Sequence, residues 1–137
     1  MHVIEHVIDP VAYVREIEDL LPPGGTAFVF TPNLHDILMS LDFEHYAFFF
    51  REQHNYYLTA TGLEVLAGTA GLAVVRSCFY HDFHITNTFG WVANPATAGH
   101  LNWDYFDPSV DGFWKGYLES RGLASQVYCV LRKPAVQ

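Results

Sequence analysis

The stretch from Leu20 to Asn33 constrains the fold of this chain more than any other part of the sequence. It reads Leu-Leu-Pro-Pro-Gly-Gly-Thr-Ala-Phe-Val-Phe-Thr-Pro-Asn, which predicts a helix end, a turn, a short strand and a sharp stop. Proline cannot continue a helix, and glycine accepts the positive φ that a chain reversal needs. The strand Thr26–Thr31 does not alternate apolar with polar residues, which is typical of a strand covered on both faces in an α/β sheet. Pro32 and Asn33 end it at the carboxyl edge, where such sheets place their ligands.

The composition is that of a folded domain, and we expect residues 1–137 to form one unit. Half of the residues are hydrophobic, whereas the net charge is −8 with only seven Lys and Arg. A chain without a basic cluster is a poor partner for nucleic acid or an anionic membrane. The sequence has no signal-peptide pattern and no apolar run of about 18 residues. We therefore expect a cytoplasmic protein in which Cys78 and Cys129 are free thiols.

Two helices are predicted on either side of this strand. Asp9 can cap a helix over residues 10–21, because aspartate accepts hydrogen bonds from the first free amides and proline is tolerated in the first turn. Thr61 and Glu64 fit a capping box that opens a second helix over residues 62–70.

The remaining elements follow from glycines and apolar runs. We expect a strand tail at residues 2–4, a left-handed cap at Gly71, a strand over 72–79, a helix capped by Asp111 and stopped by Gly122, and a last strand over 125–132. The helix after Asp111 is expected to face inward with four apolar side chains, Phe113, Trp114, Tyr117 and Leu118. Residues 34–58 are rich in aromatic side chains and in histidine, a composition that either closes over a ligand or fills core beneath a loop.

Two histidine patterns are compatible with metal binding. His2-x-x-Glu5-His6 matches the H-x-x-E-H pattern of one class of zinc peptidases, in which both histidines lie on one helical face. The surrounding Val and Ile residues favour a strand instead, so a zinc hydrolase is a lesser alternative and we predict no metal site. His81-x-x-His84 lacks a third spaced ligand and is read as incidental.

His54 is the candidate for acid–base chemistry. It lies in Glu52-Gln53-His54-Asn55-Tyr56-Tyr57, and imidazole titrates near neutral pH, so it can take a proton from a hydroxyl or an acidic carbon. A hydrogen-bonded histidine packed among aromatic side chains is the alternative, and the residues alone do not separate the two.

Several short motifs in order resemble the second half of a class I S-adenosylmethionine-dependent methyltransferase. They are His2-Val3-Ile4-Glu5-His6-Val7-x-Asp9-Pro10, Leu20-Leu21-x-Pro23-Gly24-Gly25, Thr31-Pro32-Asn33, His54-x-x-Tyr57, Leu63-x-x-Leu66 and Ala70-Gly71-Leu72. The resemblance is strongest to the branch of small-molecule O-methyltransferases and sugar C-methyltransferases. It covers residues 1 to about 80, and the final strand is similar to the closing antiparallel strand of that family.

The resemblance implies roles for particular residues. Met1 and His2 would lie beside S-adenosylmethionine at the end of the fourth strand, and Glu5 and His6 would follow at the rim of the active site. His54 matches a general base of some sugar C-methyltransferases, so the predicted catalytic residues are His54, Glu5 and His6. Three further residues are expected to contact a small-molecule acceptor: Asn33, Tyr57 and Trp91.

The sequence departs from the family pattern at three points. Gln53 stands where those relatives have a glutamate before the histidine, and Pro22 replaces a basic residue in the turn. The glycine-rich loop that holds the donor is also missing, because the sequence contains no G-x-G. We therefore expect a fragment or remnant that does not bind S-adenosylmethionine alone.

The expected fold is α/β, a partial Rossmann-like methyltransferase sheet with strand order 4-5-7-6, an antiparallel last strand and flanking helices. In the full fold the strand ending at Ile4 pairs with a first strand that this sequence does not contain, so that side of the sheet would be an open edge through which the chain is expected to self-associate. The function implied by the resemblance is methyl transfer to a hydroxyl or carbon of a small molecule as part of a longer enzyme. A non-catalytic module with an aromatic ligand surface is the alternative.

Overall fold

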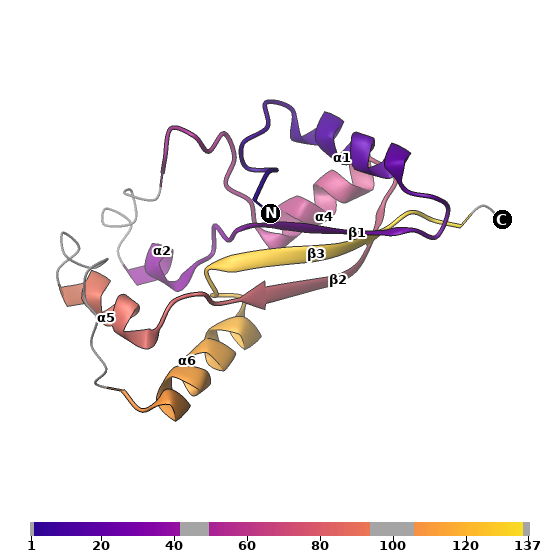
Figure 1. The fold of residues 1–137 in the computed structure, drawn as a ribbon. Helices are drawn as coiled ribbons and strands as arrows, with labels where there is room; N and C mark the ends of the chain where they lie inside the picture. The colour runs from indigo at the N-terminus through magenta and orange to yellow at the C-terminus, as the bar shows by residue number, and fades with distance from the viewer. Residues whose placement is uncertain (1, 42–49, 94–105, 136–137) are drawn as a thin grey trace.

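The computed structural model describes residues 2–41, 50–93 and 106–135 (Figure 1). In chain order the elements are α1 (Pro10–Leu20), β1 (Thr26–Pro32), α2 (Ile37–Leu41), α4 (Ala60–Thr69), β2 (Ala73–Tyr80), α5 (Ile85–Ala93), α6 (Pro108–Arg121) and β3 (Gln126–Arg132). Met1 and the aromatic residues at positions 43, 46, 48 and 49 lie outside the described residues. No helix in the described ranges is long and apolar enough to cross a membrane.

The three strands form one sheet in the order β1-β3-β2. β3 runs antiparallel to both neighbours, with Thr26 opposite Arg132 at one end of β1 and Pro32 opposite Gln126 at the other. β1 and β2 therefore point the same way, and their carboxyl ends lie at the same edge, beside α2 and α5 (Figure 1). This arrangement confirms the predicted 5-7-6 part of the sheet and its antiparallel last strand.

Helices α1 and α4 lie side by side over one face of the sheet (Figure 1). The core lies between these two layers, and the alternating residues of β3 that point toward the helices are fully or almost fully buried. The buried cluster consists of Ile4, Val14, Val29, Leu63, Ala67, Leu72, Val127, Cys129 and Leu131. Burial of apolar side chains from β1, β3 and both helices, with the partly buried Val74 and Phe79 of β2 packed against them, is the main stabilising contribution to this core.

The opposite face of β1 is open, contrary to the prediction that this strand is covered on both faces. Phe28 is 73% exposed, whereas Val29 and Thr31, which point to the helices, are buried. The apolar run in the sequence predicts the strand but does not indicate whether a second helical layer exists.

The strand predicted at residues 2–4 is also wrong. His6 N–H donates to Val3 O at 2.9 Å in a turn, and no described strand pairs with this segment.

Three of the predicted helix signals are confirmed. Asp9 Oδ1 accepts hydrogen bonds from the amides of Val11 and Ala12, both at 3.0 Å, and so caps α1. Gly71 and Gly122 have positive φ values of 76° and 70° after α4 and α6. In the turn before β1, Gly24 has a φ of 77°.

Two predicted N-caps are wrong because both helices begin earlier in the chain than predicted, α4 at Ala60 and α6 at Pro108. Thr59, not Thr61, caps α4 through a 3.0 Å bond from Gly62 N–H, while Glu64 accepts from Ser77 Oγ at 3.0 Å. Asp107 caps α6, and Asp111 stands in its first turn.

Fewer apolar side chains of α6 are buried than predicted. Leu118 is fully buried, but Phe113 is 75% exposed and Tyr117 is 46% exposed.

Candidate functional site

Two loops that are distant in sequence are joined beside the end of β1. The backbone carbonyl of Glu5 accepts from Asn55 N–H at 2.7 Å and from Tyr56 N–H at 3.2 Å. The Asn55 amide side chain donates to the carbonyls of His6 and Val7, and Tyr56 Oη donates to Ile8 O at 2.8 Å. These bonds fix the segment that carries His54 against the segment that carries Glu5 and His6.

Glu5 is the buried centre of this arrangement, with a side chain that is 1% exposed. Its Oε2 accepts from Thr31 Oγ1 at 3.4 Å, which ties it to the carboxyl end of β1. Its Oε1 has no hydrogen bond in the described part of the chain, and it lies 3.0 Å from His2 Nδ1 and 4.0 Å from His6 Nε2. Burying a carboxylate oxygen without a hydrogen bond costs folding free energy. Such an atom is therefore a candidate for a catalytic or ligand-binding role.

His6 and His54 face each other next to this carboxylate. Their ring centroids are 4.8 Å apart in an edge-on arrangement, and the ring of Tyr57 lies 5.5 Å from that of His54. His6 Nδ1 donates to Gln53 O at 2.6 Å, so in the neutral ring the lone pair is on Nε2, the nitrogen nearer Glu5. Burial, reinforced by the neighbouring His6, holds the pKa of His54 below its ordinary value, and this favours the neutral ring.

The structure thus brings the three predicted catalytic residues together. One ligand-type atom from each of Glu5, His6 and His54 lies within 4.8 Å of the others, and among the described residues this is the group of three or more such side chains that is compact enough for a metal ion. The helix that an H-x-x-E-H peptidase site requires is not formed, because residues 2–9 are turns and bends and α1 begins at Pro10. His2 lies at the edge of the group, with its ring 4.8 Å from that of Phe30.

The three residues predicted to contact an acceptor have different surroundings. Tyr57 belongs to the site, since its ring adjoins His54 and its hydroxyl accepts from Arg51 N–H at 2.7 Å. Asn33 is 2% exposed, and its amide donates to the carbonyls of Gly122 and Ala124.

Trp91, in α5, is 8% exposed and packs with Leu38 of α2 in a separate hydrophobic cluster. Its contact with an acceptor stays a prediction, as does that of Asn33.

Thr31 and Asn55 take part in the site but were not predicted from the sequence. Thr31 stands in the quoted Thr-Pro-Asn motif, yet only the fold places its hydroxyl against Glu5. Asn55 directly follows His54, and its type is common in segments that bond to nearby backbone groups.

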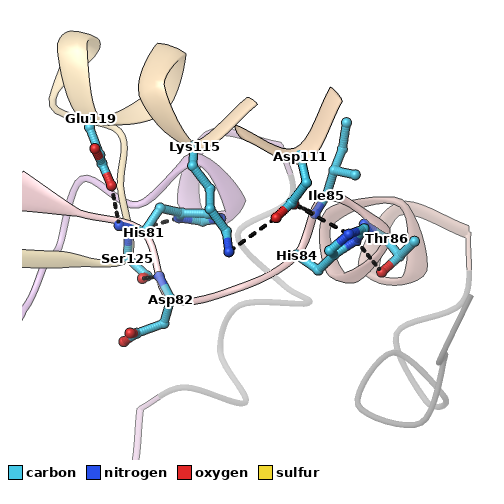
Figure 2. A network of polar contacts seen from close by, with 9 residues as sticks. All are labelled: His81, Asp82, His84, Ile85, Thr86, Asp111, Lys115, Glu119 and Ser125. Atoms are coloured by element: carbon cyan, nitrogen blue, oxygen red, sulfur yellow. Dashed lines mark hydrogen bonds and ion pairs between the residues drawn. The ribbon is translucent and has the colours of Figure 1, made fainter. Parts of the chain in front are cut away.

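A second polar network lies at the carboxyl end of β2 (Figure 2). Asp111 Oδ1 accepts from Ile85 N–H at 2.8 Å and lies 3.6 Å from His84 Nε2, while Lys115 Nζ is 3.1 Å from its other oxygen. The carboxylate that the sequence suggested as a helix cap thus joins α6 to the start of α5.

His81 occupies the buried end of this network (Figure 2). Its Nδ1 accepts from Ser125 N–H at 3.1 Å, so the neutral ring carries its proton on Nε2. Burial, followed by the nearby Lys115, holds its pKa below the ordinary value. His81 and His84 have separate partners in the described residues.

Two surface hollows in the described residues lie elsewhere. One is lined by residues that include His35, Thr59, Phe79 and Arg121, and the other by Glu64 and residues 74–77 of β2. Neither contains Glu5, His6 or His54. The Glu5 group has the stronger chemical features, because a buried carboxylate and two imidazoles converge there.

The sheet order, the antiparallel β3 and the flanking helices define an α/β protein with a partial methyltransferase fold. The family model described as "Methyltransferase domain" matches residues 1–77, more than half of the chain. This chain belongs to that family, as the sequence motifs predicted.

A solved structure gives the same fold. It is a provisionally assigned sarcosine dimethylglycine methyltransferase from Galdieria sulphuraria, which aligns with 97% of this chain at a TM-score of 0.50 and 16% identity. The alignment covers 51% of that protein, so this chain spans about half the length of its structural relative. The search of curated proteins found no match.

Proposed function

We propose that this chain forms the acceptor-side part of a longer S-adenosylmethionine-dependent methyltransferase, in which His54 removes a proton from a small-molecule acceptor. Family membership and the partial methyltransferase sheet support the reaction class. The observation that carries the assignment of His54 is its position against His6 and Glu5, at the sheet edge where α/β enzymes hold their ligands.

We infer that the described residues form at most part of a site for the donor. The sequence contains no G-x-G, and Met1 lies outside the described residues. His2 is partly exposed beside Phe30 and could form no more than one edge of such a site. We infer that the donor, which supplies the methyl group, is held mainly by another part of the enzyme.

In this proposal His54 acts on the acceptor and not on the methyl donor. Its neutral ring takes the proton from a hydroxyl or an acidic carbon as the new bond to the methyl group forms. Glu5, which raises the proton affinity of His54 electrostatically, stands in for the glutamate that Gln53 replaces. The bonds from Asn55 and Tyr56 to the Glu5 backbone keep base and carboxylate in register. We propose an acceptor of the kind used by small-molecule O- or sugar C-methyltransferases, on the sequence resemblance.

The test is methyl transfer by the complete enzyme with and without the imidazole. His54→Ala should lower turnover by about two to four orders of magnitude while donor binding is retained. His35→Ala, which removes an exposed histidine outside the Glu5–His6–His54 group, is the matched control and should leave turnover unchanged. Unchanged turnover in His54→Ala would assign His54 to packing. Ligand binding by the 137-residue chain without any methyl transfer by the complete protein would favour the binding-module alternative.

A further inference from the structure

The ligand-type atoms of Glu5, His6 and His54 are only slightly farther apart than the ligands of a bound metal ion. Its three ligand-type atoms lie within 4.8 Å of one another. Ligands at about 2.1 Å from a tetrahedral Zn²⁺ are separated by about 3.4 Å. The largest separation must therefore contract by up to about 1.4 Å for the group to hold an ion. His6 and His54 are not buried, and small side-chain rotations can supply this change.

Two of the three side chains carry buried atoms that lack hydrogen bonds in the described residues. Glu5 Oε1 and His54 Nδ1 are inaccessible to water, and neither has a hydrogen bond in the described residues. Each of these atoms can offer a lone pair to a metal ion, and Glu5 is 1% exposed. Coordination would satisfy both atoms, and at Glu5 Oε1 it would replace the 3.0 Å contact with His2 Nδ1.

The surrounding contacts are those of a supported metal site. His6 Nδ1 donates to Gln53 O, which directs the lone pair of the other nitrogen toward Glu5. The second oxygen of Glu5 accepts from Thr31 Oγ1, which limits rotation of the carboxylate. Metal-binding histidines and carboxylates commonly have such outer partners, because these fix the tautomer and orientation.

We propose that Glu5, His6 and His54 bind one divalent transition-metal ion, with Zn²⁺ or Co²⁺ as suitable ions, and leave a coordination position open. Two imidazoles and one carboxylate favour these ions over Mg²⁺ or Ca²⁺, which prefer all-oxygen sites. His2 is not a ligand in this proposal. Its Nδ1 lies 3.0 Å from the same oxygen of Glu5, so it is a competitor that the ion displaces.

Metal binding goes beyond the proposed methyl transfer and does not depend on it. A coordinated His54 has no free lone pair for a proton, so the ion and the base function exclude each other in one complex. In the loaded site, an acceptor hydroxyl at the open position would have its pKa lowered by the ion. Only this last step rests on the proposed function.

The test is metal binding by the purified 137-residue chain, measured without donor or acceptor. Co²⁺ titration followed by visible absorption should show one ion per chain with a low coordination number, and calorimetry with Zn²⁺ should give the same stoichiometry. His54→Ala and Glu5→Gln should each weaken binding by at least about 100-fold, since loss of a ligand should exceed the 10- to 100-fold effect of losing an outer partner. His2→Ala, which removes the competing contact with Glu5, should bind at least as tightly as the parent, and His35→Ala should bind as the parent does.

Circular dichroism identifies any variant that fails to fold. Because Glu5 is buried, its substitution is the riskier one, and His54→Ala keeps the proposal testable. Absence of stoichiometric binding by the folded parent would overturn the proposal. Parent-like binding by His54→Ala, or loss of binding in His2→Ala, would assign a different ligand set and also overturn it. None of these results depends on whether the complete enzyme transfers methyl groups.

Discussion

Replacing Gly24 by alanine tests the turn that joins α1 to β1. Gly24 has a φ of 77°, and its N–H donates to Lys133 O at 3.0 Å, which ties the turn to the end of β3. A Cβ added there would meet no atom within 4 Å, so the cost arises from the backbone conformation alone. The left-handed conformation costs an L-residue about 1–2 kcal/mol. The lower entropy of the unfolded alanine chain offsets about 0.4–1 kcal/mol of this cost.

The net destabilisation of Gly24→Ala should therefore be about 1 kcal/mol, equivalent to a fall in Tm of about 3–5 °C for a chain of this length. Gly68→Ala is the matched control. Gly68 lies inside α4 without a positive φ, and its added Cβ also meets no atom within 4 Å. The same chemical change should there raise stability by about 0.5–1 kcal/mol, because alanine is the better helix former.

Gly25→Ala provides a steric comparison in the same turn. Its Cβ would lie 2.8 Å from Pro22 O and 2.9 Å from Pro22 Cδ, so the turn would have to shift. Thermal unfolding followed by circular dichroism, with urea denaturation for the free energies, measures all three variants. The reasoning is refuted if Gly24→Ala is as stable as the parent while Gly68→Ala is stabilised as expected.

Two further predictions concern buried polar groups. Because burial lowers the pKa of His81 in the folded chain, the unfolded chain binds the proton more readily, and stability should fall as the pH drops from about 7 to 5. His81→Asn, which can still accept from Ser125 N–H, should reduce this slope in urea denaturation, and a parent stability independent of pH would contradict the prediction. Asn33→Ala removes both bonds to the Gly122 and Ala124 carbonyls and should cost about 1–3 kcal/mol, whereas a change below about 0.5 kcal/mol would show that water replaces them.

Local sequence determined the elements whose signals involve neighbouring residues. Asp9 caps α1 because its carboxylate reaches amides two and three positions ahead, whatever the rest of the chain does. Gly24, Gly71 and Gly122 mark positive φ because glycine alone has little steric cost there. The order of β1, β3 and β2 was also predicted, through the resemblance to a family with that sheet order and not through propensity.

Local sequence failed where a side chain had a choice of partners. Thr59 and Thr61 are both suitable caps by type, and only the start of α4 decides that Thr59 accepts the bond from Gly62. Asp111 has the composition of a cap, but it bonds to Ile85, 26 residues earlier in the chain. Phe28 illustrates a different limit, because an apolar strand residue does not show whether a second layer covers it.

For the candidate site, too, the sequence predicted the residues, and only the tertiary structure shows how they are arranged. The sequence singled out His54, Glu5 and His6 by residue type and by motif, because imidazole and carboxylate are the groups that move protons. It did not show that they touch, since 48 residues separate His6 from His54. Only the tertiary structure brings them together, through the backbone bonds of Asn55 and Tyr56 to Glu5, and leaves Glu5 Oε1 buried without a hydrogen bond in the described chain. Proximity and burial arise from the fold, and they convert three separately plausible residues into one chemical group.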